Sequence, residues 1–363
     1  MKPLQILTRR RQRGPVKTIA LSGLLLASLC LVSGCSDDDD PTTPETGPDN
    51  TDVTTWDEDG QFWRSQIDAT SETEFARFSF ADRDIVGNPR GLGADWDIAF
   101  RRDEIQLNGG ASGPGTAEGA ILAGREFASV TTADVADATW QPDAIDYSVD
   151  EWYIYDPVQN QLNMTQNVYS MVDASGDHYV KFRIDRLEGT SRTSMGTVHI
   201  TYFFQTNPND LALGGTVETA AIEAGEGTAY FDFSSGSIVS PTEPSASLDW
   251  DIAFGSFNVA LNGGPNGAGG CAAFPAFGEL DDPTEIEAFT SQPVGAPLFP
   301  DVVGSALTDW YDYNPQVHQL SAKDQCYLIR DGEKTYKLRI ESYYSDVGGQ
   351  PLAATYRFIW AEL

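Results

Sequence analysis

The hexapeptide "DWDIAF" occurs twice in this chain, at Asp95–Phe100 and again at Asp249–Phe254, 154 positions apart. The tetrapeptide "LNGG" repeats at the same offset, at 107–110 and 261–264. Other landmarks recur in the same order: "WYIYDPVQNQL" from Trp152 with "WYDYNPQVHQL" from Trp310, and "KFRI" from Lys181 with "KLRI" from Lys337. An ordered series of matches at nearly constant spacing indicates an internal duplication. The sequence therefore predicts two copies of one unit.

The spacing of the landmarks places the copies at residues 61–205 and 215–363. Each copy has a length that is ordinary for a domain and sufficient for a hydrophobic core. Residues 206–214 carry Pro, Asn, Asp and Gly between two strand-like runs, which is typical of a connection. We therefore expect two tandem domains joined by this linker.

The N-terminus predicts export. Residues 1–34 combine a basic start with a short apolar stretch, as a secretory signal peptide does. The ending "LVSGC" resembles a bacterial lipobox, in which the cysteine, here Cys35, is diacylated and becomes the first mature residue. An ordinary signal peptide with an incidental cysteine is the alternative. The predicted location is the bacterial outer membrane, by a lipid anchor and on the cell surface.

Residues 35–60 are acidic and nearly free of apolar side chains, so we expect a flexible tether. The acidic run "SDDDD" after Cys35 resembles the surface-export signal of Bacteroidota lipoproteins, and a solubilising spacer explains it equally well. The formal net charge of the chain is −31. Nucleic acids and anionic lipid surfaces are therefore expected to be poor partners.

Alternating apolar and polar residues predict β-strands in both copies, for example in "HYVKFRID", "TVHITYFF" and "ATYRFIW". Gly-rich and Asn-rich turns separate these runs, which favours antiparallel sheets in a sandwich or an open barrel. A short helix is expected near residue 132, with Thr131 or Thr132 as its N-cap. The predicted fold class is all-β.

Several motifs together resemble the HmuY-like haem-binding lipoproteins of Bacteroidota. They are the lipid cysteine, an F-x-F strand, "WD-x-A-F", an Asn before a Gly-rich loop, and the late runs "YKLRI" and "TYRF". The resemblance covers both copies. It implies an all-β surface protein that captures haem and passes it to an outer-membrane receptor.

The iron ligands implied by the resemblance are pairs of His or of Met. His318 lies near the segment where one family ligand occurs, but the first copy has Asn160 at the corresponding position. Met164 is the candidate donor in the first copy. His178 follows a turn and is expected in a solvated loop, and His199 lies in an alternating strand, so neither is expected to bind iron. The sequence predicts that haem binding, if present, resides in the second copy.

Two further cysteines occur only in the second copy. Cys271 and Cys326 stand where the first copy has Ala117 and Val168. Exported proteins meet oxidising conditions, so a disulfide between them is favoured over two free thiols.

No catalytic pattern is present in the sequence, since it contains neither G-x-S-x-G nor H-E-x-x-H and has only three histidines. The two glycine loops also lack the Lys-Ser/Thr ending of a phosphate loop. The expected function is non-enzymatic capture of haem or a related tetrapyrrole. The alternative is a structural or protein-interaction module that keeps the fold without a haem site.

Overall fold

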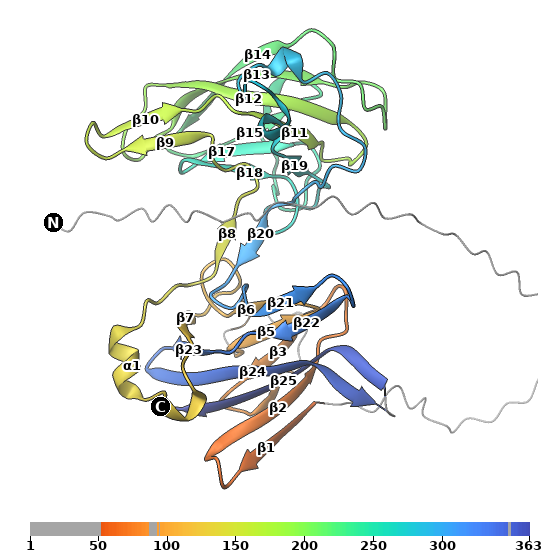
Figure 1. Cartoon of the computed structure of the whole chain (residues 1–363). Coiled ribbons are helices and arrows are strands. Elements are labelled where there is room, and N and C mark those ends of the chain that lie inside the picture. The colour runs from red at the N-terminus through yellow and green to blue at the C-terminus, as the bar shows by residue number, and fades with distance from the viewer. Residues whose placement is uncertain (1–51, 87–92, 94, 348–349) are drawn as a thin grey trace, which may run out of the picture. The chain divides into compact units, whose positions relative to one another are not determined.

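The computed structural model describes residues 52–86, 93, 95–347 and 350–363, and in this part the chain is almost entirely β-structure (Figure 1). Its sheets are antiparallel, and none of those formed by the described residues closes into a barrel. The predicted all-β fold class is confirmed. Buried apolar side chains gather mainly between sheets, in two separate clusters.

The first cluster lies in what we call the terminal core, which is formed by residues 53–143 together with 305–363. Its larger sheet has the strand order β1-β2-β25-β24-β23-β7. These strands are β1 Val53–Asp57, β2 Phe62–Asp68, β25 Gln350–Glu362, β24 Lys334–Val347, β23 Gln325–Asp331 and β7 Glu118–Ala123. The smaller sheet, β4-β3-β5-β6, consists of β4 Asp84–Ile85, β3 Ala76–Ser79, β5 Ile98–Arg101 and β6 Glu104–Leu107.

Aromatic side chains join the two sheets of the terminal core. Phe78 of β3 meets Phe358 of β25 edge to face, with ring centroids 5.6 Å apart, and Phe80 stacks on Tyr336 of β24 at 4.5 Å. The alternation of apolar residues along these strands puts the aromatic rings on the inner faces. The arrangement is a two-layer sandwich.

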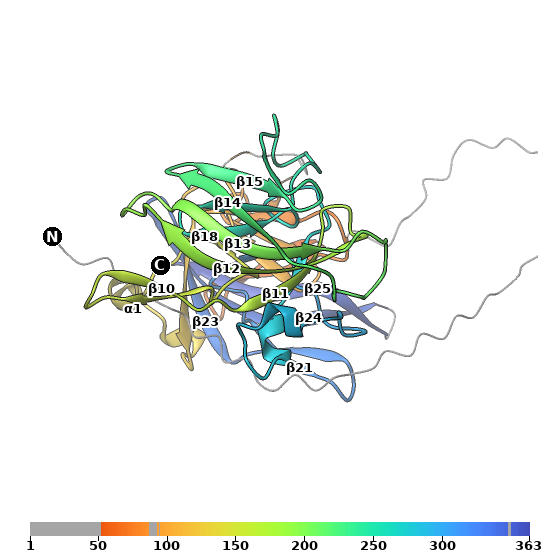
Figure 2. The same cartoon turned by 90° about the horizontal axis from the view of Figure 1, so that it is seen from above.

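The second cluster lies in the central core, which is formed by residues 149–299. Its larger sheet, β14-β13-β12-β11-β19, consists of β14 Glu218–Gly225, β13 Gly196–Phe204, β12 Tyr179–Glu188, β11 Val168–Val172 and β19 Ala272–Phe274. Its smaller sheet, β16-β15-β17-β18, consists of β16 Ser237–Val239, β15 Thr228–Asp232, β17 Ile252–Gly255 and β18 Asn258–Leu261. The neighbouring strands β12 and β13 are seen side by side in Figure 2.

Three two-stranded ribbons complete the β-structure. The hairpins are β9 Tyr153–Asp156 with β10 Gln161–Met164, and β21 Tyr311–Asn314 with β22 Gln319–Ala322. The third ribbon pairs β8 Ala144–Asp146 with β20 Val302–Gly304, and it is formed by the two chain segments that connect the cores.

Both cores combine strands from the two sequence copies, which departs from the expectation that 61–205 and 215–363 each form a domain. In the terminal core, β7 of the first copy pairs with β23 of the second copy, with Tyr327 opposite Ile121. In the central core, β13 of the first copy pairs with β14 of the second, and β11 pairs with β19. The copies have exchanged their halves.

The predicted linker 206–214 lies inside the central core as the connection between the paired strands β13 and β14. Leu213 in this segment is fully buried, and its backbone N–H donates to the carbonyl oxygen of Thr290 at 2.7 Å. Of the predicted tether 35–60, residues 35–51 lie outside the described residues, and residues 53–57 form β1, which pairs with β2. Low apolar content concealed this edge strand.

Helices are few and short. They are α1 Thr132–Asp137 and the 3-10 helices η1 Phe127–Ser129, η2 Ala276–Glu279 and η3 Ile286–Ala288. The expected N-cap is confirmed at Thr131, whose side chain accepts from the N–H of Ala133 and forms a capping box with Asp134. Within the described ranges, no helix has the length and apolar character needed to cross a membrane.

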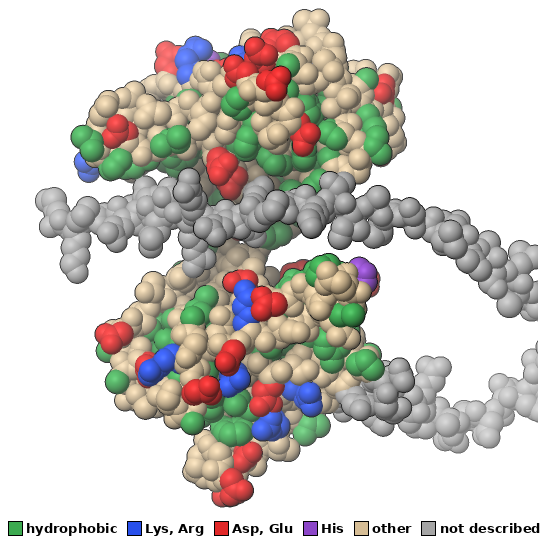
Figure 3. Space-filling view, in the orientation of Figure 1, with side chains coloured by type: hydrophobic (Ala, Val, Ile, Leu, Met, Phe, Trp, Pro, Cys, Tyr) green, Lys and Arg blue, Asp and Glu red, His purple; other side chains and the backbone are tan. Residues whose placement is uncertain are grey.

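Acidic side chains are spread over the visible surfaces of both cores, with basic ones among them (Figure 3). Salt bridges neutralise part of this negative charge, for example the one between Arg339 and Asp324 at 2.9 Å. On the face shown, the acidic side chains are therefore not gathered at one site.

Candidate functional site

The second aspartate of each "DWDIAF" repeat fastens strands together. The carboxylate of Asp251 accepts the backbone N–H groups of Phe233 and Ala174, each at 2.8 Å. Ala174 follows β11 of the first copy, so this carboxylate links the two copies. Asp97 accepts the N–H of Phe80 at 2.7 Å in the same way. The repeated motif thus has a structural role.

The asparagine of each "LNGG" shapes the glycine loop that follows it. The Asn262 side chain donates to the carbonyl of Trp250 and accepts from the N–H of Gly269. Asn108 makes the equivalent bonds to Trp96 and Gly115. These loops are closed by their own hydrogen bonds, which explains their sequence without a ligand.

A second pair of acids, Asp143 and Asp301, anchors the same loops. Asp301 accepts from the backbone N–H of Leu261 at 2.8 Å, and Asp143 does the same for Leu107. Burial raises the pKa of both carboxyl groups, and of Asp97 and Asp251, to about 6. Because each of the four is held by backbone donors, we assign them to the scaffold and not to acid-base chemistry.

Cys271 and Cys326 are free and buried, so the predicted disulfide is not formed. Cys271 belongs to the cluster of the central core, whereas Cys326 lies in a cluster that covers the larger sheet of the terminal core. Their thiols donate to the carbonyl oxygens of Asp251 and Arg125, respectively. The exchange of halves between the copies puts the two cysteines in different cores.

His318 lies in the turn between β21 and β22 and is exposed. Its backbone φ is +53°, a left-handed conformation that His and Asn adopt more readily than most residues. Asn160, in the matching turn between β9 and β10, also has φ +53°. The hydroxyl of Tyr313 lies 2.5 Å from Nδ1 of His318, just as Tyr155 donates to Oδ1 of Asn160 at 2.9 Å.

The other candidate donors are engaged in local structure. Met164 on β10 is partly buried and packs against the cluster of the central core. Nδ1 of His178 bonds the carbonyl oxygen of Gln205 at 3.0 Å, and Nε2 of His199 lies 3.1 Å from a carboxylate oxygen of Glu188. Met164 and His318 belong to different cores and are not brought together as one ligand pair.

Cys35 lies outside the described residues, so its predicted lipidation stays a prediction. In the described part of the chain, no group of three or more His, Cys, Asp or Glu side chains is placed to hold a metal ion.

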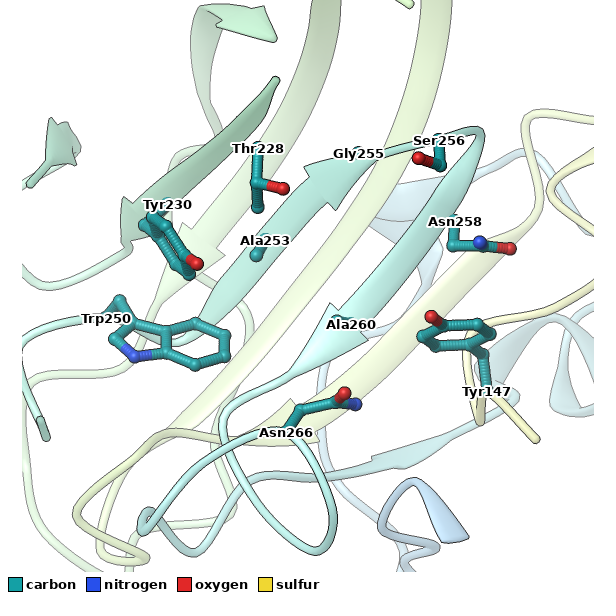
Figure 4. A pocket seen from close by; sticks show the side chains of 10 residues that line it. All are labelled: Tyr147, Thr228, Tyr230, Trp250, Ala253, Gly255, Ser256, Asn258, Ala260 and Asn266. Atoms are coloured by element: carbon teal, nitrogen blue, oxygen red, sulfur yellow. The ribbon is translucent and has the colours of Figure 1, made fainter. Parts of the chain in front are cut away.

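A hollow of about 240 Å³ opens on the outer face of the smaller sheet in the central core (Figure 4). Strands β15, β17 and β18 form its floor, and Tyr147 comes from the segment that follows β8. Its lining carries no charged side chain and consists of Tyr147, Thr228, Tyr230, Trp250, Ala253, Gly255, Ser256, Asn258, Ala260 and Asn266.

Comparison with known proteins finds a family match in the second copy. Residues 226–358 match the family model described as HmuY protein. This segment is HmuY-like. The resemblance inferred from the motifs is confirmed for these residues. The HmuY-like segment runs from β15 into β25 and therefore contributes to both cores.

Among solved structures, the chain is similar to the crystal structure of a candidate lipoprotein from Bacteroides fragilis. The identity is 11%, the TM-score is 0.31, and the alignment covers 87% of this chain and 97% of that one. Among curated proteins, none matches this chain.

Sequence reasoning missed the role of the lysine in "KFRI" and "KLRI". Lys181 is 1% exposed, and its ammonium group donates to the carbonyl oxygens of Ile286 at 3.0 Å and Phe289 at 2.9 Å. Lys337 donates to Phe127 and Val130, both at 3.1 Å. Burial lowers the pKa of both lysines. A basic residue repeated at an inward-facing strand position was the available signal.

Proposed function

We propose that this chain is an exported, lipid-anchored protein of the cell envelope that captures haem or a related tetrapyrrole through its HmuY-like segment. The family match over residues 226–358 carries the proposal. The proposed iron donor is His318, which lies within that segment. Delivery to an outer-membrane receptor is part of the same proposal.

The β21–β22 hairpin supports this choice of donor. At its tip, Tyr313 is 50% exposed and Val317 is 55% exposed, so apolar surface lies beside the imidazole. A tetrapyrrole has two flat apolar faces and an iron that binds imidazole nitrogen. The hairpin therefore offers both kinds of contact.

The hydrogen bond to Tyr313 also suits His318 as a ligand. When the proton is on Nδ1, the imidazole donates to the tyrosine oxygen and the Nε2 lone pair is available for iron. Metal-binding histidines commonly have their second nitrogen held in this way.

Titration of haem into the soluble chain from Ser36 onward tests the proposal. We expect the wild-type protein to give a saturable, red-shifted Soret band. His318→Asn should lower the affinity for haem at least about tenfold, because the axial bond is lost. Asn160 already adopts the same turn conformation, so asparagine should preserve the fold at this position. An unchanged spectrum in the variant would rule out His318 as the donor.

The reciprocal variant Asn160→His provides a matched control. It places an imidazole in the other hairpin, where Ile154 and Val158 are 65% and 91% exposed. If a hairpin imidazole beside apolar side chains is sufficient, this variant should bind a second equivalent of haem.

The lipid anchor is tested separately. Cys35→Ala should move the protein from the membrane fraction of its native host to the soluble fraction, because the acylated thiol is absent. Unchanged fractionation would contradict the anchor.

The exposed apolar tips of both hairpins favour a second candidate function, a protein-interaction module without haem. The β9–β10 tip combines Ile154 and Val158 with Asn160, an amide that is a poor iron ligand. If wild-type protein gives only the absorbance of free haem, this second function is supported and the first is excluded.

A further inference from the structure

The hollow of the central core is a slot between aromatic walls. Figure 4 shows Tyr230 and Trp250 on one side and Tyr147 on the other, with Ala253 and Ala260 between them. Tyr230 and Trp250 meet edge to face, with ring centroids 5.0 Å apart. Small side chains on β17 and β18 leave the floor open.

In the terminal core, larger side chains fill the corresponding face of the smaller sheet, although its strands pair in the same register as those of the central core. The row Tyr230, Ala253, Ala260 of the central core corresponds to the row Arg77, Ala99, Gln106 of the terminal core. In the next row, Gly255 and Asn258 correspond to Arg101 and Glu104.

These larger side chains cover the terminal-core face. The Arg77 guanidinium lies over the ring of Trp96 at 5.6 Å, and that of Arg101 lies over Phe75 at 4.3 Å. Arg101 also pairs with Glu104 at 2.8 Å. The fold therefore does not require a hollow at this place, and the hollow depends on the smaller side chains that the second copy carries at these positions.

Polar groups surround the slot without protein partners. The hydroxyls of Tyr147, Tyr230, Thr228 and Ser256 and the amide of Asn258 make no hydrogen bond to another described residue. Together they supply both donors and acceptors, and none is charged. A tyrosine hydroxyl is protonated at neutral pH, and burial raises the pKa of Tyr147 further.

We propose that this slot binds the pyranose ring of a neutral carbohydrate. A sugar ring has C–H faces that pack on aromatic rings and a rim of hydroxyls that need both donors and acceptors. The acidic surface and the neutral lining disfavour charged sugars. The hollow is smaller than the roughly 300 to 1,000 Å³ of drug-sized pockets, which suits a single ring better than a macrocycle.

The test uses the soluble chain from Ser36 onward with glucose, galactose, mannose and N-acetylglucosamine, and with an array of neutral glycans. Saturation-transfer NMR and calorimetry measure binding. We expect at least one probe to bind and Ala260→Gln to weaken it at least about tenfold by filling the floor. Gln106 occupies the equivalent position in the terminal core, so the fold accepts this side chain.

Gln106→Ala is the matched control, because it changes the equivalent position without touching the slot, and it should leave sugar binding unchanged. Should Ala260→Gln unfold the protein, Tyr147→Ala removes one wall of the slot instead. Absence of binding by every probe, or binding that survives both slot variants, would overturn the proposal. His318→Asn should not affect sugar binding, so the haem and sugar proposals fail independently.

Discussion

At the scale of single residues, the repeated chemistry of the two copies holds each core together across the copies. Lys181 comes from the first copy and binds carbonyls in and just after η3 of the second. Lys337 of the second copy binds carbonyls in and just after η1 of the first. A buried ammonium is costly unless it is well hydrogen-bonded. The two buried lysines therefore help to hold segments of the two copies together within each core.

Replacement of Lys181 by methionine should destabilise the central core. Methionine fills similar space but leaves the carbonyl oxygen of Phe289 without its ammonium donor, whereas that of Ile286 keeps only the backbone N–H of Phe289 at 3.3 Å. We therefore expect a loss of about 1 to 3 kcal/mol of unfolding free energy. Urea unfolding measures the loss, and hydrogen exchange should rise at residues 286–289. Lys337→Met is the matched control, and its cost should be smaller because Lys337 is only partly buried. Equal stability of Lys181→Met and wild type would contradict this role.

His318 illustrates what a sequence can and cannot reveal about a site. Imidazole is a good iron ligand and an amide is a poor one, so His318 and the aligned Asn160 differ in their chemistry. Both residues stand at a turn position with a left-handed backbone conformation, which favours His and Asn. The sequence pattern does not reveal this backbone geometry. The sequence therefore aligned the two residues and the structure gives them the same turn conformation, while the role of His318 as an iron donor stays a prediction.

At the scale of elements, local patterns predicted individual strands and the helix cap but missed β1. The run "HYVKFRID" lies mostly in β12, "TVHITYFF" lies in β13, and the capped helix begins after Thr131 as expected. Period-two alternation reports which face of a strand is buried, so strands can be inferred from it. It does not report which distant strand is the neighbour. The pairings of β7 with β23 and β13 with β14 were therefore beyond sequence reasoning.

The slot was missed for a related reason. Its small residues, Ala253, Gly255 and Ala260, belong to ordinary strand patterns, and Tyr147 comes from a segment far away in the sequence. A cavity is defined by side chains that are absent as much as by those that are present. Only a comparison of equivalent positions in the two copies shows that the side chains lining the slot are smaller than their counterparts.

At the scale of the whole molecule, the exchange of halves makes a prediction about fragments. The central core is built from one continuous stretch, so residues 144–301 should form a monomer that unfolds cooperatively. Residues 215–363, one sequence copy, contain half of each core and should associate or stay partly unfolded, because their strand edges lack partners.

Analytical ultracentrifugation and thermal unfolding of the two fragments give the measurement. A third fragment joins residues 53–143 to 305–363 through a short Gly-Ser linker. It contains the whole terminal core and should also fold. The opposite outcome, a stable monomer of 215–363 with an unfolded 144–301, would mean that each copy closes on itself in solution.

The two connections between the cores also bear on resistance to proteolysis. In a simple tandem protein, one cut in the single linker sheds the distal domain. Here two separate strands of polypeptide, which pair as β8 and β20, join the cores. A nick in 206–214 falls within the central core, and a nick in either connection leaves the other intact. Release of the central core from the terminal core therefore requires two independent cleavages.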